Sequence, residues 1–245
     1  MADVKTMILT GASRGIGHAT VQRFSAAGWR VITCSRDEMP EACKADPNWT
    51  HHLTADLGDA ESRAAFIRRA MEILAGGPLH ALVNNAGVSP KTPFKERLGC
   101  LNGDIRDWYE VFELNFFAPL VMARGFAAAL AKGKGAIVNI TSIAGHAVHP
   151  FAGSAYSTSK AALSGLTREM AVEFAELGVR VNAVAPGEIE TAMLSADYEM
   201  LIPRIPLRRM GQPLDVADCV FWLCGPESGY VTGTEIFVTG GQHLY

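Results

Sequence analysis

The strongest constraint on the fold is the alternation of short apolar runs with longer helical patterns along the chain. Seven runs are typical of strands, at about 4–10, 30–34, 50–54, 79–84, 135–140, 179–185 and 234–239. Most lack a clean apolar–polar alternation, as expected where helices cover both faces of a sheet. The order predicts an α/β fold, a doubly wound parallel sheet of about seven strands with helices on both faces and right-handed crossovers.

Chain length and helix boundaries fit a single domain, residues 1–245. The 245 residues can bury one large core, 49% of them are hydrophobic, and no repeat or low-complexity tract divides them. Asp104 and Pro213 stand where helices would begin, and Gly178 follows the end of another.

The charge balance gives no reason to expect a polyanionic partner. A net charge of −3 and a pI near 6.2 argue against binding to nucleic acid or to an anionic membrane. No secretory signal is visible, and we see no apolar run near the roughly 20 residues that span a bilayer. Five cysteines, an odd number without metal-ligand spacing, favour a reducing cytoplasm and no metal site.

A glycine-rich turn between the first strand and the first helix is a candidate phosphate site. The run from Thr10 to Gly17 reads Thr-Gly-Ala-Ser-Arg-Gly-Ile-Gly. Glycines let a backbone approach a pyrophosphate, and the first N–H groups of a helix, at its positive dipole end, hold the anion. The spacing Gly-x-x-x-Gly-x-Gly differs from the commoner Gly-x-Gly-x-x-Gly, so a purely structural turn is the alternative.

Tyr156 and Lys160 form a second candidate site. Four residues apart on a helix, their side chains leave the same face. A neighbouring ammonium favours the phenolate, so we expect the pKa of the phenol to fall from about 10 towards neutrality. Such a phenol gives a proton to a carbonyl oxygen or takes one from an alcohol. The alternative is an amphipathic helix that carries both residues without chemistry.

Three further motifs follow later strands: Asn-Asn-Ala-Gly at 84–87, Thr-Ser at 141–142 and Pro-Gly at 186–187. With the glycine turn and Tyr-x-x-x-Lys, in this order, they resemble the short-chain dehydrogenase/reductase family, in particular its 3-oxoacyl-carrier-protein-reductase-like members. The resemblance runs from Thr10 to Gly241 and implies a Rossmann-like fold. Every motif lies at the carboxyl end of a strand or in the next helix, where doubly wound sheets bind ligands, and this placement supports the resemblance independently.

The resemblance implies four catalytic residues. Tyr156 would be the general acid in reduction and the general base in oxidation. Lys160 would lower the pKa of Tyr156 and bond the nicotinamide ribose. Ser142 would hydrogen-bond the substrate oxygen, with Thr141 and Ser154 as alternative hydroxyls.

Asn115 is the fourth of these residues. Pro119, four positions later, lacks the N–H that would bond the Asn115 carbonyl within a helix. We therefore expect a kink at Asn115 and, as the resemblance implies, an ordered water on its carbonyl that passes protons towards Lys160. A bend that serves packing alone is the alternative.

The resemblance also implies a nicotinamide dinucleotide cofactor. Ser35 stands where NAD-preferring relatives usually have an acid, and Arg36, with Arg14 of the glycine turn, would suit a 2′-phosphate. NADP(H) is favoured, but NAD(H) stays open, because Asp37 could neutralise Arg36 or replace the acid and both arginines could be solvated. Asp56 would contact the adenine or else cap the next helix. The expected cofactor-binding residues are Gly11, Ser13, Arg14, Gly15, Ile16, Gly17, Arg36, Asp56, Leu57, Asn84, Ala86, Gly87, Tyr156, Lys160, Pro186, Gly187, Ile189 and Thr191.

Two segments are expected to bind the substrate, residues 88–103 and a loop at about 188–210. Glu188 and Glu190 of the second segment are expected to be exposed. His146 and His149 would face the substrate or lie in a loop without chemistry. The second segment also carries apolar residues that would form a lid: Met193, Leu194, Tyr198, Met200, Leu201 and Ile202. The first carries cations that would attract an acidic or carrier-borne substrate or stay solvated: Lys91, Lys95 and Arg97.

The leading prediction is an NADP-preferring oxidoreductase that interconverts a ketone and a secondary alcohol by hydride transfer, with Tyr156 as acid and base. A nucleotide-dependent isomerase or dehydratase is one alternative. The absence of a further long substrate domain after Gly187 argues against it. A non-catalytic NADP-binding regulator is the other, and it would not need all four catalytic residues. We expect a small-molecule substrate, a cytoplasmic location and, as is common in the family, a homotetramer.

Overall fold

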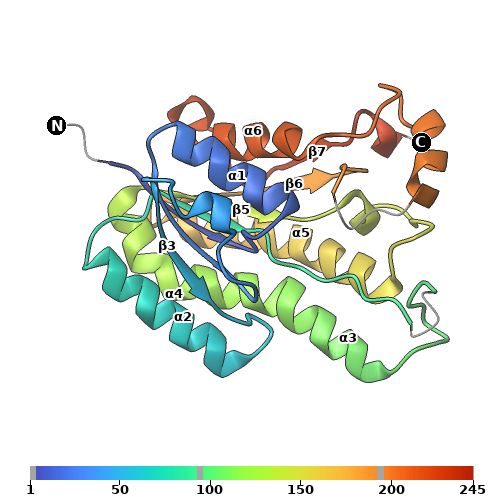
Figure 1. Cartoon of the computed structure of the whole chain (residues 1–245), viewed down its shortest axis with the longest axis horizontal. Helices are drawn as coiled ribbons and strands as arrows, with labels where there is room; N and C mark the ends of the chain where they lie inside the picture. The colour runs from blue at the N-terminus through green and yellow to red at the C-terminus, as the bar shows by residue number, and fades with distance from the viewer. Residues whose placement is uncertain (1–3, 93–95, 192–195, 245) are drawn as a thin grey trace.

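One seven-stranded parallel sheet forms the centre of the molecule (Figure 1). The structure, a computed structural model, describes residues 4–92, 96–191 and 196–244. Within them the strand order is β3-β2-β1-β4-β5-β6-β7, and every neighbouring pair is parallel. The predicted fold class and strand count are therefore confirmed. The strands are β1 Thr6–Thr10, β2 Arg30–Ser35, β3 Trp49–Thr54, β4 Ala81–Asn84, β5 Ala136–Ile140, β6 Arg180–Pro186 and β7 Glu235–Val238.

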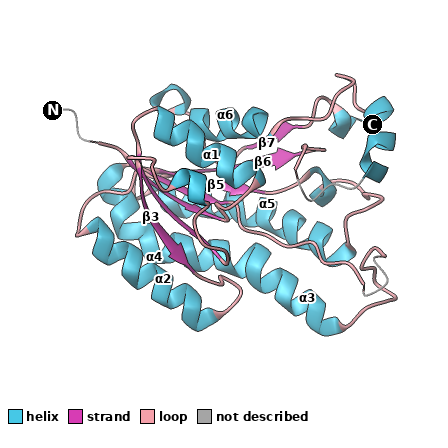
Figure 2. Ribbon diagram, viewed as in Figure 1, coloured by secondary structure: helices cyan, strands magenta, loops and turns pink. Residues whose placement is uncertain are grey.

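Helices cover both faces of this sheet (Figure 2). Alternate residues of a strand join different cores: Ile8 packs with α2, α4 and α5, whereas Met7 and Leu9 pack with α1 and α6. Because both sides of a strand are buried in this way, apolar residues occupy successive positions. The helices are α1 Gly15–Ala26, α2 Ala60–Leu74, α3 Ile105–Phe112, α4 Ala118–Gly133, α5 Ser154–Ala175 and α6 Pro213–Cys224, and the 3₁₀ segments are Glu41–Cys43, Ile143–Gly145, Ala196–Arg204, Pro226–Ser228 and Gln242–Leu244.

Local capping explains where several helices begin. The Asp104 carboxylate accepts the N–H of Arg106 at the start of α3, and Pro213 is the first residue of α6. A proline suits that position because the first N–H of a helix has no intrahelical acceptor. Both predicted helix starts are confirmed.

The strand order reverses direction between β1 and β4. From β1 the chain winds outward through β2 to β3, then returns to place β4 on the other side of β1. Loops leave the carboxyl ends of β1 and β4 in opposite directions, and the crevice between them is the usual ligand position in such sheets. The predicted motifs at 10–17 and 84–87 flank this crevice.

A π-helical turn, Glu113–Phe117, joins α3 to α4. In it the N–H of Ala118 bonds the carbonyl of Glu113, five residues back. Pro119 has no N–H to bond a carbonyl within the helix, and a wide turn directly before it accommodates this missing hydrogen bond. At Asn115, where the sequence predicted a kink, the structure has this π-turn inside the continuous helix Ile105–Gly133.

That continuous helix, Ile105–Gly133, has the length and mean hydropathy (1.5) of a bilayer-spanning helix. The sequence analysis had found no such candidate. Its apolar residues Met122, Phe126 and Leu130 are fully buried against the sheet. Core packing accounts for the buried part of this helix, 44% of its most apolar window.

The glycine turn after β1 depends on a close backbone approach. Gly11 has φ +74° and Gly15 φ +58°, in the left-handed region that favours glycine. A Cβ on Gly17 would lie 2.1 Å from the Gly11 carbonyl oxygen and 2.5 Å from the Asn85 amide nitrogen. No side chain larger than hydrogen fits there.

We expect Gly17→Ala to lower the free energy of unfolding by about 2 kcal/mol or more, because the added methyl overpacks backbone that cannot retreat. Gly165→Ala is the matched control: its Cβ would meet only the end of Arg168, at 3.8 Å. There alanine should stabilise α5 by roughly 0.5–1 kcal/mol. Urea denaturation without added ligand measures both, and equal effects of the two substitutions would contradict the close approach.

Candidate active site

A cavity of about 370 Å³ opens at the carboxyl edge of the sheet. Segments that follow β1 to β6 all contribute to its wall, so residues far apart in sequence meet there. Of the predicted site residues, only Asn84 and Asn115 are not on this wall. Those that line it are Gly11, Ser13, Arg14, Gly15, Ile16, Gly17, Arg36, Asp56, Leu57, Ala86, Gly87, Ser142, Tyr156, Lys160, Pro186, Gly187, Ile189 and Thr191.

The start of α1 supplies unbonded donors to the cavity. The first bond of the helix runs from the His18 N–H to the Arg14 carbonyl, and no side chain caps the N-terminus. The N–H groups of Gly15, Ile16 and Gly17 precede that bond and so lack intrahelical acceptors. Donors at the positive end of a helix dipole, beside glycines, fit the pyrophosphate of a dinucleotide.

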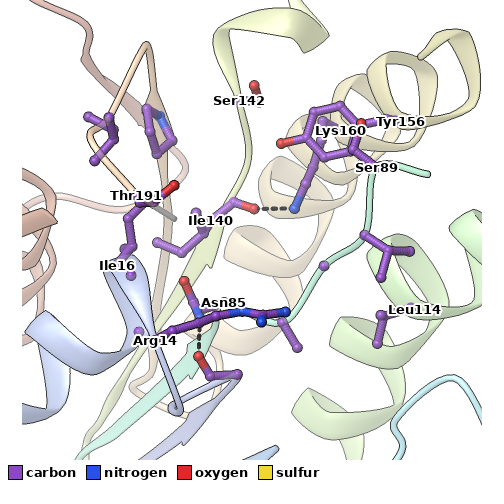
Figure 3. A pocket seen from close by; sticks show the side chains of 18 of the residues that line it. Arg14, Ile16, Asn85, Ser89, Leu114, Ile140, Ser142, Tyr156, Lys160 and Thr191 are labelled. Atoms are coloured by element: carbon purple, nitrogen blue, oxygen red, sulfur yellow. Dashed lines mark hydrogen bonds between the residues drawn. The ribbon is translucent and has the colours of Figure 1, made fainter. Parts of the chain in front are cut away.

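Asn85, which the sequence analysis did not single out, holds this turn in place. Its side-chain N–H groups donate to the carbonyls of Thr10 (3.0 Å) and Gly11 (2.9 Å). The Thr10 hydroxyl in turn accepts the backbone N–H of Asn85 and of Ala86. Figure 3 shows Asn85 between Arg14 and Ile140, among the residues that line the cavity.

Asn84, predicted to line the cavity, is instead buried behind it. Its amide donates to the Asn139 side chain of β5 at 2.8 Å. Successive residues of an extended segment face opposite sides, so only one of the two asparagines can turn towards the crevice. The predicted motif at 84–87 therefore reaches the cavity, but through Asn85 and not through Asn84.

Two arginines, Arg14 and Arg36, line the end of the cavity that lies beyond the carboxyl end of β2. Arg14 and Arg36 are exposed, and neither forms an ion pair within the described parts of the chain. Asp37 does not neutralise Arg36; its carboxylate accepts the Ser13 hydroxyl at 3.3 Å. The Ser35 hydroxyl donates to the Asp37 carbonyl at 2.6 Å, which fixes this loop.

Asp56 lines the same end of the cavity, and the next helix has a different cap. The Asp59 carboxylate accepts the Ser62 N–H at the start of α2. Asp56 instead accepts the Gly58 N–H at 2.9 Å. The structure therefore favours Asp56 as a cavity residue over Asp56 as a helix cap.

Ser142, Tyr156 and Lys160 come together at the opposite end of the cavity (Figure 3). Ser142 follows β5, and the other two lie one turn apart on α5. The Ser142 oxygen accepts the Ala144 N–H, and its hydroxyl lies close enough to Tyr156 to lower the pKa of the phenol. Lys160 is almost wholly buried and donates to the Ile140 carbonyl at 2.7 Å.

The pKa of Tyr156 moves in the direction opposite to the one predicted. Burial raises the pKa of the phenol, the Ser142 hydrogen bond lowers it, and the nearby Glu188 carboxylate raises it again. The Lys160 amine lies 5.7 Å from the centre of the Tyr156 ring and is engaged by the Ile140 carbonyl. Burial also lowers the pKa of Lys160 to about 8.

The alternative hydroxyls are occupied or displaced. Thr141 lines the cavity, but its hydroxyl donates to the Val184 carbonyl at 3.0 Å and also contacts the Glu235 carboxylate. Ser154 is the first residue of α5 and is not on the cavity wall. Ser142 is therefore the hydroxyl that the cavity presents beside Tyr156.

Asn115 lies directly behind the cavity wall and is fully buried. Its amide donates to the Val88 carbonyl (3.0 Å) and the Ser159 hydroxyl (3.1 Å), and its oxygen accepts the Val88 N–H (2.9 Å). The side chain thus ties the π-turn to α5 and to the segment that follows β4. Because these hydrogen bonds occupy the side chain, Asn115 could contact a ligand only with its backbone.

Glu188 is buried, contrary to prediction, whereas Glu190 is exposed as expected. The Glu188 side chain is 4% exposed and pairs with His149 at 2.6 Å, and both residues line the cavity. No local sequence signal identified this pair, since its members are 39 residues apart. Other cavity residues that the sequence analysis missed include Cys34, Ala55, Val88, Ser89, Leu114, Ile143, Ala144 and Ala152.

Much of the predicted lid lies outside the described residues. This holds for Met193 and Leu194, for the side chain of Tyr198 and, in the first segment, for Lys95. Further along, Leu201 is buried and Met200 is exposed.

Comparison with known proteins agrees with this geometry. A family model described as "Enoyl-(Acyl carrier protein) reductase" matches residues 11–243. Protein FixR of Bradyrhizobium diazoefficiens is 54% identical over 244 residues, which cover 99% of this chain and 88% of that protein.

Two solved structures extend the comparison. A short-chain dehydrogenase/reductase from Brucella ovis, in complex with a partially ordered NAD, is 47% identical with a TM-score of 0.81, covering 96% of this chain and 100% of that one. A 3-oxoacyl-[acyl-carrier protein] reductase with bound NAD from Brucella melitensis is 28% identical with a TM-score of 0.89, covering 100% and 93%. From the full-length matches and the motifs gathered at one sheet edge, we conclude that the chain belongs to the short-chain dehydrogenase/reductase family of oxidoreductases.

Proposed function

We propose that the protein interconverts a ketone and a secondary alcohol by hydride transfer, with Tyr156 as general acid and general base. The observation that carries the proposal is one cavity with two complementary ends. One end offers the unbonded N–H groups of α1 to a dinucleotide, and the other presents the Tyr156 hydroxyl beside Ser142. A carbonyl group between the two ends meets a proton donor and a second hydrogen-bond donor.

In the reductive direction, the Ser142 hydroxyl donates to the substrate carbonyl oxygen as negative charge builds there. The Tyr156 hydroxyl would give its proton to that oxygen, and a nicotinamide held in the cavity would supply the hydride that the reduction needs. Because burial raises the pKa of Tyr156, the phenol holds its proton at neutral pH and is ready to donate it. The oxidative direction needs the phenolate and so speeds up as pH rises.

Lys160 and Asn115 would support the proton transfer from behind. A charged Lys160 amine would place a positive charge near the phenolate that forms and so stabilise it. Asn115 lies in the π-turn, and its side chain bonds Ser159 of α5. Turns of this kind are frequent at functional sites. A water on its carbonyl would link Lys160 to solvent, as predicted from the sequence.

The cofactor we propose is NADP(H) in preference to NAD(H). Arg14 and Arg36 are exposed cations without carboxylate partners in the described residues, and both line the cavity. A guanidinium presents several donors to a phosphate and stays charged. Ser35 supplies no carboxylate to bond a ribose 2′-OH or to repel a 2′-phosphate.

We propose one domain over 1–245, a small-molecule substrate bound by the loop at about 188–210, a homotetramer and a cytoplasmic location.

Tyr156→Phe should lower kcat about a thousandfold in the reduction of ketones by NADPH, because the proton donor is lost while the ring remains. Tyr230→Phe is the matched control, since Tyr230 is fully exposed. Cofactor oxidation is followed by absorbance and NADPH binding by fluorescence. A Tyr156→Phe protein with more than a tenth of wild-type activity would refute the acid–base role.

Arg36→Ala should raise the KM for NADPH about tenfold and leave the KM for NADH unchanged, because it removes a charge-assisted contact to the 2′-phosphate alone. Arg68→Ala, an exposed arginine of α2, is the control. If the wild-type protein had the lower KM for NADH, or if Arg36→Ala bound NADPH as before, the cofactor preference would be wrong.

Lys160→Met should abolish activity without loss of stability at pH 7. The folded-state pKa of Lys160, about 8, lies below its ordinary value of 10.5. Charging the buried amine therefore costs stability in full below pH 8, and the cost disappears as pH rises towards 10.5. The variant should be at least as stable as wild type at pH 7, with its advantage shrinking by pH 10.

Urea denaturation at several pH values measures this difference. Lys132→Met is the control, because Lys132 also donates to a backbone carbonyl, that of Gly76, but on an exposed side chain. Its stability difference from wild type should not vary with pH in this way. A Lys160→Met protein clearly less stable than wild type at pH 7 would contradict the expectation.

A further inference from the structure

The Glu188 carboxylate is a buried acceptor that the proposed reaction does not use. Its Oε1 accepts two hydrogen bonds, from His149 Nε2 at 2.6 Å and from Gln242 Nε2 at 3.2 Å. Its Oε2 makes no hydrogen bond to any residue in the described part of the chain. Glu188 is on the wall of the cavity that holds Tyr156 and Ser142, so the open lone pairs of this oxygen are a ready acceptor for a ligand.

The hydrogen bonds of Nδ1, the second ring nitrogen of His149, determine which nitrogen carries the ring proton. Nδ1 accepts the backbone N–H groups of Phe151 (3.2 Å) and Ala152 (3.1 Å), so it carries no proton. The single ring proton must then lie on Nε2, which donates it to Glu188. The imidazole is neutral, and it orients the carboxylate without cancelling its negative charge.

The backbone around Glu188 is rigid as well. Its carbonyl accepts the Gly211 N–H at 2.9 Å, and the Glu190 N–H returns a bond to the Gly211 carbonyl at 2.8 Å. The carboxylate is thus held on three sides before any ligand arrives, as a preorganised recognition group should be.

The neighbouring cations do not occupy this acceptor. Lys160 donates to the Ile140 carbonyl, and Lys91 donates to the Phe151 carbonyl. Among the described side chains on this wall, Glu188 therefore offers a strong acceptor to which no described residue donates at Oε2.

We propose that Glu188, oriented by His149 and Gln242, is the substrate-specificity residue of this site and binds a hydroxyl group on the carbon next to the reacting one. The substrate class is then an α-hydroxy ketone and its product a vicinal diol. A plain ketone leaves the carboxylate oxygen unpaired, and an α-keto acid sets a second negative charge beside it. The assignment rests on the ketone reductase function proposed above.

Three probes share one half of their structure and test this directly. 1-Hydroxy-2-butanone carries the hydroxyl, 3-pentanone replaces it with a methyl group, and 2-oxobutanoate carries a carboxylate at the same carbon. Wild type should reduce the hydroxy ketone with kcat/KM at least tenfold above that for 3-pentanone.

Glu188→Gln keeps the size of the side chain and removes its charge. It should lower the ratio of kcat/KM for hydroxy ketone over 3-pentanone at least fivefold, and raise kcat/KM for 2-oxobutanoate relative to 3-pentanone. Glu190→Gln is the matched control: the same change on an exposed residue two positions away, outside the cavity. A smaller change in Glu188→Gln, or an equal one in Glu190→Gln, would overturn the assignment.

A binding measurement separates this proposal from the one on which it rests. If wild type reduces none of the three ketones, the proposed function fails. The subsite is then judged by ligand-observed NMR titration of the three probes against NADPH-saturated Tyr156→Phe protein, with and without Glu188→Gln. Preferential binding of 1-hydroxy-2-butanone that Glu188→Gln abolishes supports the subsite, and equal binding of all three rejects it.

Discussion

The two hydrogen bonds from the Asn85 amide to the carbonyls of Thr10 and Gly11 are the contact on which the site depends. They join the carboxyl ends of β1 and β4, the two strands between which the sheet changes direction. Gly17 then fits against Gly11 with no room for a side chain, which sets the start of α1 over the crevice. Without this junction, the first N–H groups of α1 would not face the same cavity as Ser142, Tyr156 and Lys160.

Repetitive local patterns made most of the fold predictable. The seven apolar runs located every strand to within two residues at each end. Parallel strands place all their carboxyl ends at one edge, so the motifs that follow them had to converge there. The pattern could not decide between neighbours, however: which of Asn84 and Asn85 faces the crevice depends on how β4 pairs with β1 and β5.

What the sequence did not reveal depends on partners that are distant along the chain. The Glu188 carboxylate is buried because His149, 39 residues before it, and Gln242, 54 residues after it, both donate to it. A glutamate in a polar stretch otherwise suggests exposure. Lys160, on α5, likewise finds its acceptor in the carbonyl of Ile140, the last residue of β5. The spacing of Tyr156 and Lys160 placed them together correctly, but it carried no information about solvent.

Solvent exclusion is what reverses the predicted pKa of Tyr156. A lysine in water beside a phenol would favour the phenolate, but here burial disfavours the charged form of both groups: the pKa of Tyr156 rises while that of Lys160 falls. Each group is therefore easier to find neutral than in water, and Glu188 adds to the cost of a phenolate. A phenol so placed holds its proton until a neighbouring oxygen gains negative charge. That is the behaviour that the proposed reaction requires of its acid, which must act only when hydride reaches the adjacent carbon.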